Sequence, residues 1–357
     1  MSANADDAPT WPKISRYFTP PPQYANQLGP YRSPLLFDDG TPVKTPADWP
    51  RRRQEILSYW HKTMGPWPPL IDHPKIDDLE SKPRENFTQH KVMVQVAPKQ
   101  SIAGYLLVPP GRGPFPAVFV PFYDPETSAG LDPSKPLRDF AYQLTKRGFV
   151  TLSIGSPGGD ARKPDTAGIA IQPLSYLGYV AANCCNALAS LPEVDPQRIG
   201  IVGHSYGGKW AMFGSCLYDK YAAAVWSDPG IVWDEARPSV NYWEPWYLGL
   251  DPTLPQQRKP GVITPDRPRT GAYKVLIESG HDLHELHALM APRPFLVSGG
   301  SEDSPKRWPV LNHAIAVNKL LGQTDRVAMT NRPAHGPTPE SNEVIYLFFE
   351  HLLMNKP

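Results

Sequence analysis

The segment Arg198–Lys209 carries the clearest chemical signal, because Gly203-His-Ser205-Tyr-Gly207 sets a serine between two glycines. Residues 199–202 before it form a short apolar run, and the residues after it favour a helix. At such a strand-to-helix turn the serine hydroxyl is exposed, since the flanking glycines let the chain segments pass closely. We therefore predict that Ser205 is a nucleophile. A tight turn with an idle serine is the alternative.

A serine hydroxyl is a weak nucleophile until a base removes its proton, so the chemistry also requires a histidine. His335 lies in Arg332-Pro-Ala-His-Gly-Pro337, after the last predicted strand and before the last predicted helix. In serine hydrolases with this kind of turn, the order along the chain is serine, acid, histidine. We predict that His335 is the base.

The acid that orients the histidine has three candidates. Asp303 follows the apolar run 295–297 and has the common Gly-x-x-Asp spacing from Gly300, which makes it the preferred one. Asp228 lies directly after the run 222–226, and Glu302 is the neighbour of Asp303. The spacing favours Asp303, but it leaves Asp228 and Glu302 open.

The negative charge that develops on a substrate carbonyl needs two N–H donors held in place beforehand. The backbone N–H of Tyr206, which follows the nucleophile, is one predicted donor. The second is expected from the loop after the run 117–121, where we choose Tyr123.

The histidines of His281-Asp-Leu-His-Glu-Leu-His287 suggest a metal site at first sight. A zinc-binding pair on a helix has histidines four residues apart, whereas the spacings here are three and three. No metal and no other cofactor is predicted.

Alternating strands and helices must position these residues. Residues 91–97 and 102–108 read as a hairpin. Later apolar runs predict strands, and the segments between them predict helices, which indicates a mostly parallel sheet covered on both faces. The runs lie at 117–121, 149–154, 199–202, 222–226, 295–297 and 327–329, and the helices at 136–147, 175–190, 206–217, 307–321 and 341–353.

Two further segments extend this pattern. Residues 1–90 form a proline-rich N-terminal extension with one expected helix, for which Thr45 is the N-cap and Pro46 the first residue. Residues 91–357 form the main domain, which includes an aromatic-rich insertion at 229–281. A long insertion of this kind is usually functional, so we expect a cap or a cleft wall. Its aromatic residues either stack on sugar rings or pin the loop to the body.

Composition narrows the function classes. With 36 Lys plus Arg against 35 Asp plus Glu, the chain has a net charge of +1 and no electrostatic footprint for nucleic acid. No apolar stretch approaches 18 residues, and the first residues lack the pattern of a signal peptide, so we expect a soluble protein without a membrane partner.

We call the turn Gly203–Gly207 the nucleophile elbow. This elbow with Lys209, together with the motif Asp282–Pro294 ahead of a strand, resembles the glucuronoyl esterases, carbohydrate esterases of the α/β-hydrolase superfamily. The resemblance covers roughly residues 91–353. It implies an α/β-hydrolase fold with Ser205 and His335 as catalytic residues, an acid at the place of either Asp228 or Asp303, and Lys209 in contact with sugar hydroxyls. Tyr206 stands where that family usually has arginine. The chain also broadly resembles acetyl xylan esterases.

The sequence therefore predicts a serine esterase that hydrolyses carboxylic esters of carbohydrate through an acyl-enzyme, with glucuronoyl esters as the candidate substrates. Within the same chemistry, an acetyl xylan esterase or a general carboxylesterase is the alternative. From another class, the alternative is a non-catalytic carbohydrate-binding protein on a hydrolase scaffold. The partner in each case is a small-molecule or polysaccharide ester.

Overall fold

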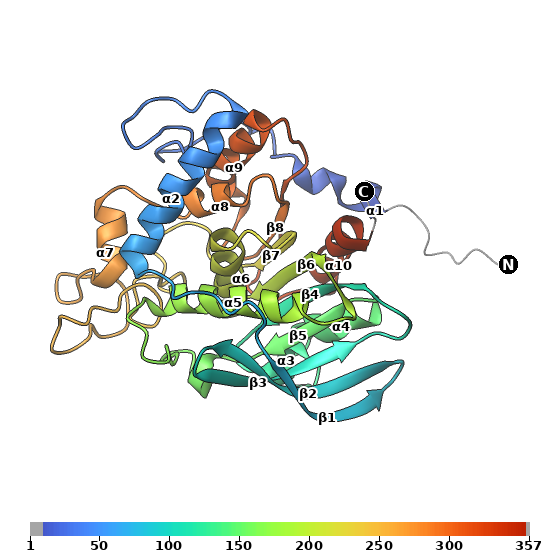
Figure 1. The fold of residues 1–357 in the computed structure, drawn as a ribbon. Helices are drawn as coiled ribbons and strands as arrows, with labels where there is room; N and C mark the ends of the chain where they lie inside the picture. Colours follow the sequence, from blue (N-terminus) through green and yellow to red (C-terminus); the bar gives the residue numbers. More distant parts are fainter. Residues whose placement is uncertain (1–9, 355–357) are drawn as a thin grey trace.

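A nine-stranded sheet forms the centre of the protein, whose structure is a computed structural model that describes residues 10–354 (Figure 1). The spatial order is β1-β2-β3-β5-β4-β6-β7-β8-β9. The pairs β1/β2, β2/β3 and β3/β5 are antiparallel, and all later pairs are parallel. The strands are β1 (Ile76–Arg84), β2 (Phe87–Ala97), β3 (Gln100–Val108), β4 (Phe115–Pro121), β5 (Val150–Ile154), β6 (Val194–His204), β7 (Ala223–Ser227), β8 (Phe295–Gly299) and β9 (Val327–Asn331).

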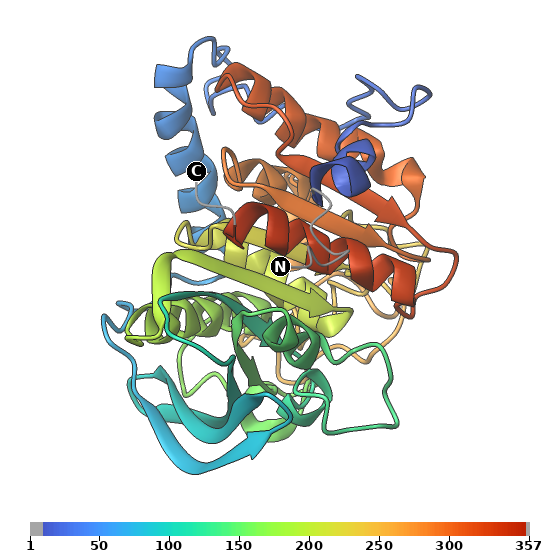
Figure 2. The same ribbon diagram turned by 90° about the vertical axis from the view of Figure 1, so that its right-hand side faces the viewer.

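Helices cover both faces of this sheet, as Figure 2 shows from the side of α10. Each predicted helix has a counterpart, and α6 has the predicted bounds. The helices are α1 (Thr10–Ile14), α2 (Trp49–Met64), α3 (Pro125–Ser128), α4 (Phe140–Lys146), α5 (Pro173–Ala189), α6 (Tyr206–Leu217), α7 (Gly271–Glu278), α8 (His284–Leu289), α9 (Trp308–Leu320) and α10 (Pro339–Phe349). The predicted α/β-hydrolase fold is confirmed.

Strand β4 illustrates why the central strands are apolar throughout. Ala117 and Phe119 belong to the core under α5 and α6, whereas Val118 and Val120 belong to the core under α4 and α10. Successive side chains of a strand point to opposite faces, so a strand buried on both sides needs an apolar residue at every position. All four side chains are fully buried.

The N-terminal extension contains the expected helix. Thr45 and Asp48 form a capping box around a short 3₁₀ turn that begins at Pro46, and α2 follows. Trp60 of α2 is buried, and its indole Nε1 donates to Glu285 Oε2 of α8 at 2.9 Å, which attaches the extension to the body. Strand β1 begins at Ile76, so the sheet starts before residue 91.

The insertion at 229–281 lies between β7 and α8 and contains α7 (Figure 1). Tyr242 and Trp243 are fully buried, and their rings pack at 6.3 Å from Phe213 and 6.0 Å from Tyr273. Tyr242 therefore pins the insertion to α6 of the body, whereas Trp243 packs within the insertion against α7. No helix within residues 10–354 has both the length and the apolar character needed to cross a membrane.

Two buried histidines attach the chain before α2 to α8 and α9. His284 Nε2 donates to the carbonyl oxygen of Arg32 at 2.7 Å, and His313 Nε2 donates to that of Leu28 at 2.8 Å. Burial lowers the pKa of His284 to about 4 and also lowers the pKa of His313. Both rings therefore support this contact as neutral donors at neutral pH.

We predict that His284→Gln weakens the acid sensitivity of the fold. The folded-state pKa lies below the unfolded value of about 6.5, so the unfolded chain binds the proton first as the pH falls. The stability contribution of neutral His284 is complete at pH 7 and is lost toward pH 4. Urea unfolding should show that the variant loses less stability than the wild type between pH 7 and 5, by up to about 2 kcal/mol. A difference as small as that of exposed His73→Gln would contradict this account.

Candidate active site

Ser205 lies between β6 and α6 in a strained backbone conformation. Its φ is 56° and its ψ is −113°, and a positive φ of this kind is uncommon for residues other than glycine. Its N–H donates to the carbonyl oxygen of Ser227 at 2.8 Å, which ties the turn to the end of β7. Such strain costs of the order of 1–3 kcal/mol and persists because the surrounding chain fixes it.

The two glycines of the motif are required because backbone segments meet at the turn. A Cβ on Gly203 would lie 2.1 Å from the carbonyl oxygen of Gly207. A Cβ on Gly207 would lie 2.2 Å from the carbonyl oxygen of Pro121, at the end of β4. Any side chain at either position would push apart the elbow and the loop that carries Tyr123.

Ser205, His335 and Asp228 form a continuous hydrogen-bonded chain. The distance from Ser205 Oγ to His335 Nε2 is 2.9 Å, and His335 Nδ1 lies 2.7 Å from Asp228 Oδ2. The Asp228 side chain is fully buried, whereas 39% of the His335 side chain is exposed. The ring can therefore meet a substrate on one side and a desolvated carboxylate on the other.

Arg332 holds the loop of His335 and was missed by the sequence reasoning. Its guanidinium donates to the carbonyl oxygens of His335 and Gly336 at 2.7 Å each, and to that of Ser298 at 2.8 Å. The ring of His204 also packs 4.7 Å from the ring of His335. The sequence could have pointed to Arg332 because it lies three residues before His335. A sequence pattern does not, however, predict that an arginine is buried.

The structure brings Asp228 to His335, although the spacing favoured Asp303. Asp303 is fully buried and accepts the backbone N–H groups of Gly230 and Ile231 at 2.9 and 2.7 Å. Asp228 follows β7 directly and has a φ of 52°, and this backbone conformation turns its side chain toward His335. The carboxylate of Asp303 makes its contacts with the loop beneath the triad and none with His335.

Glu302, the third candidate acid, is held from the other side. Ser239 Oγ donates to its carboxylate at 2.7 Å, and Arg237 pairs with it at 3.3 Å. Within the described residues, Glu302, Asp228 and His335 form the one trio of possible metal ligands, with donor atoms within 4.8 Å of one another. His335 and Asp228 are hydrogen-bonded to each other and the Glu302 carboxylate to Ser239 and Arg237, so the three groups already have protein partners.

The histidines at 281, 284 and 287 have three separate surroundings. His281 Nδ1 lies 2.7 Å from Glu285 Oε2, and His284 donates to Arg32. The ring of His287 is buried 5.2 Å from that of Trp226. These contacts agree with the spacing argument that the three rings do not converge.

The two residues predicted as oxyanion donors lie in the loop after β4 and at the start of α6. Tyr206 is the first residue of α6, where an N–H has no intrahelical acceptor. In the β4 loop the N–H of Phe122 donates to Ile154 at 3.2 Å, which leaves Tyr123 as the next donor along the chain. The rings of Tyr123 and Tyr206 stack at 4.9 Å. Tyr123 also lines a cavity of about 500 Å³ together with Ser156, Asp124, Glu126 and Asp165, among others.

Lys209 lies beneath the site, and its prediction as a sugar contact finds no support in this geometry. The side chain is buried, its Nζ donates to the carbonyl oxygen of Pro229, and it lies 4.6 Å from the ring centre of Tyr242. Burial lowers the pKa of Lys209 to about 8, and the nearby Asp303 carboxylate opposes that shift. Lys209 is thus placed to support the loop of Asp228 from below.

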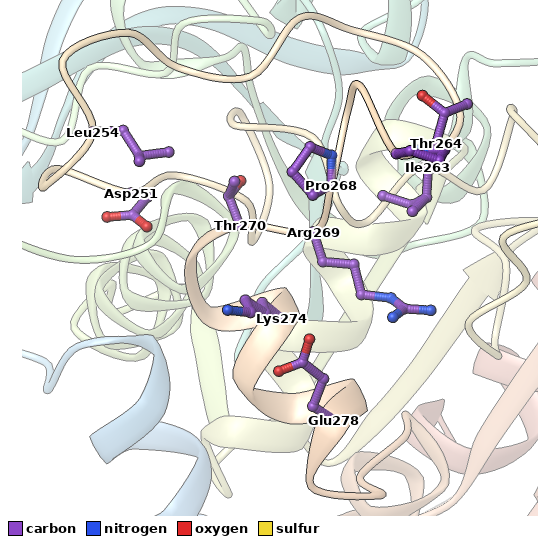
Figure 3. Close-up of a pocket in the computed structure, with 10 residues that line it drawn as sticks. Asp251, Leu254, Ile263, Thr264, Pro268, Arg269, Thr270, Lys274 and Glu278 are labelled. Carbon is purple, nitrogen blue, oxygen red and sulfur yellow. The ribbon is translucent and has the colours of Figure 1, made fainter.

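A second cavity, of about 580 Å³, lies in the insertion (Figure 3). Its lining includes Asp251, Leu254, Ile263, Arg269 and Lys274. The guanidinium of Arg269 is bound to Glu235 at 2.6 Å. None of the predicted catalytic residues lines this cavity.

The mostly parallel sheet, the serine at the turn after β6 and the histidine after β9 together define an α/β hydrolase. A family model described as "Esterase FrsA-like" matches residues 79–234, under half of the chain. The matched segment contains Ser205 and Asp228 and ends before His335. Among curated proteins, no sequence match is found.

Solved structures of esterases share this fold over nearly the whole chain. A glucuronoyl esterase from Solibacter usitatus has a TM-score of 0.72 at 16% identity, covering 90% of this chain and 97% of its own. A glucuronoyl esterase of carbohydrate esterase family 15 from Caldicellulosiruptor kristjansonii has 0.63 at 18%, covering 92% of each chain. A protein described as an acetyl xylan esterase, from Bacteroides fragilis, has 0.55 at 18%, covering 90% and 87%. The predicted resemblance to these esterases is confirmed for the fold, and the matching family model and these three structures are all described as esterases.

We predict that Gly207→Ala disables the site. The new Cβ would displace Pro121 or the elbow, and a misplacement of about 1 Å costs roughly 100-fold in rate. Ester hydrolysis and thermal unfolding of the purified variant measure the effect. Gly322→Ala is the control, because its φ of 70° is positive, unlike that of Gly207, and its Cβ would meet open space. Wild-type activity of Gly207→Ala, or an equal loss of activity in Gly322→Ala, would contradict the role given to the close approach to Pro121.

Proposed function

We propose that this protein is a serine esterase that hydrolyses carboxylic esters of carbohydrate through an acyl-enzyme. The observation that carries the proposal is the hydrogen-bonded chain from Ser205 Oγ through His335 to Asp228, with distances of 2.9 and 2.7 Å. Serine, histidine and acid are all in place, which disfavours a non-catalytic carbohydrate-binding role.

In the proposed reaction, His335 Nε2 accepts the proton of Ser205 as Oγ attacks the ester carbonyl. Asp228 holds the imidazole ring by Nδ1 and stabilises the imidazolium that forms. His335 then gives its proton to the leaving alcohol oxygen, and the tetrahedral intermediate collapses to the acyl-enzyme. Water, deprotonated by the same nitrogen, attacks the acyl-enzyme, so that Ser205 regains its proton and the carboxylic acid leaves.

The oxyanion donors in this mechanism are the backbone N–H groups of Tyr206 and Tyr123. The first has the positive end of α6 behind it, which favours negative charge. The second lies on the loop after Pro121. This loop can come close to α6 because Gly207 has no side chain to meet the Pro121 carbonyl oxygen. Each such donor is worth a few kcal/mol of barrier when it is aimed at the developing charge.

We propose a glucuronoyl ester as the substrate, supported by the fold-wide similarity to the glucuronoyl esterases from Solibacter usitatus and Caldicellulosiruptor kristjansonii. The likeness to the acetyl xylan esterase from Bacteroides fragilis supports acetylated carbohydrate as the second candidate. Tyr206 stands where the glucuronoyl esterases usually have arginine, and its ring is buried and stacks on that of Tyr123.

We predict that Asp228→Asn lowers kcat by about 10³- to 10⁴-fold, the scale of a comparable substitution in another serine hydrolase. The amide keeps the shape of the side chain but neither fixes the tautomer of His335 nor balances its charge. Steady-state kinetics on a chromogenic ester measure the loss. Asp282→Asn is the matched control, because Asp282 also accepts backbone N–H groups, from Leu283 and Trp233. Near-normal activity of Asp228→Asn with loss in Glu302→Gln would make Glu302 the acid.

We also predict that the wild type hydrolyses a benzyl glucuronate ester faster than p-nitrophenyl acetate, and that Ser205→Ala hydrolyses neither. A fluorophosphonate should label the wild type at Ser205. Preference for the acetate would support the acetyl esterase, and full activity of Ser205→Ala would refute the mechanism.

A further inference from the structure

Two aspartates on neighbouring loops each bind the backbone of the other's loop. Asp228, after β7, accepts the N–H groups of Gly300, Asp303 and Glu302 at 2.6, 2.9 and 3.3 Å. Asp303, after β8, accepts those of Gly230 and Ile231 at 2.9 and 2.7 Å. The loops are therefore joined in both directions by carboxylates that are nearly or fully buried.

This exchange leaves little freedom to Asp228. Its backbone has a φ of 52°, and a Cβ on Gly300 would lie 2.6 Å from Asp228 Oδ2. The amides of the β8 loop thus approach the carboxylate from one side, and His335 Nδ1 meets Oδ2 from another. A small turn of the loop after β7 would break the contact with His335.

The remaining contacts of that loop come from below. Lys209 Nζ donates to the carbonyl oxygen of Pro229, and Tyr242 Oη donates to that of Gly230 at 2.7 Å. Every residue from 228 to 231 therefore has a partner in α6, in the β8 loop or in the insertion.

Charge acts on the Asp303 carboxyl in both directions. Burial, and then the neighbouring Asp228 carboxylate, raise the pKa of Asp303, while Lys209 and the two accepted N–H groups act in the opposite direction. A buried acid in such a place costs free energy unless its hydrogen bonds are used. Five backbone N–H groups supply these hydrogen bonds, three to Asp228 and two to Asp303.

We propose that Asp303 is a positioning residue for the catalytic acid: by binding the N–H groups of Gly230 and Ile231, it holds the loop of Asp228 so that Oδ2 faces His335. Asp303 itself touches neither His335 nor Ser205. The inference rests on the proposed function, and it assigns to Asp303 a part different from that of the triad acid.

The test is Asp303→Asn. The new amide NH₂ cannot accept a hydrogen bond, so one of the two backbone N–H groups loses its acceptor. Because Asp303 is fully buried and would act only through Asp228, we expect kcat to fall by about 10- to 100-fold with KM nearly unchanged, and fluorophosphonate labelling of Ser205 to slow in parallel. Glu285→Gln is the control, since Glu285 is also a buried carboxylate and binds Trp60 away from the triad. It should keep kcat even if it unfolds at a lower temperature.

A folded Asp303→Asn protein with wild-type kcat, or with a change in KM alone, would overturn the inference. If this variant does not fold, Asp303→Ser tests the same two N–H contacts with a shorter acceptor, and a wild-type kcat there would overturn the inference equally. A wild type that neither hydrolyses esters nor reacts with the fluorophosphonate would overturn the proposed function itself, which is a distinguishable result.

Discussion

The close approach of three backbone segments around Ser205 is the constraint on which the site depends. The end of β4, the elbow after β6 and the start of α6 meet where Gly203 and Gly207 have no side chains. That contact holds the nucleophile in a left-handed conformation and brings the loop of Tyr123 next to the first turn of α6. The sheet, covered by helices on both faces, supplies the rigidity that the strain requires.

The carboxyl ends of β7, β8 and β9 complete the site from neighbouring positions in the sheet. Because these strands are parallel and adjacent, their following loops lie at one edge, and Asp228, Asp303 and His335 meet there. Arg332 binds the His335 loop to β8, and the two aspartates bind the β7 and β8 loops to each other. The triad is thus one part of a larger network of buried polar contacts, in which most groups bind backbone.

The insertion shows how an aromatic-rich segment can be structural and still bear on the site. Tyr242 and Trp243 are buried, so these rings are not available to sugars. Yet Tyr242 holds the loop of Asp228 through Gly230, and the ring of Tyr247 lies 6.3 Å from that of Tyr206. The insertion therefore supports the acid and the elbow from behind.

The sequence by itself determined the fold class, the elbow and the place of His335, because local spacing and strand periodicity encode them. Which of Asp228, Asp303 and Glu302 lies against His335 was decided by tertiary structure, since it depends on the direction in which each side chain leaves its loop. The sequence pattern predicts neither the φ of 52° at Asp228 nor the two backbone N–H groups that donate to Asp303. The same holds for Lys209, which the motif associates with sugar and the fold buries beneath Pro229.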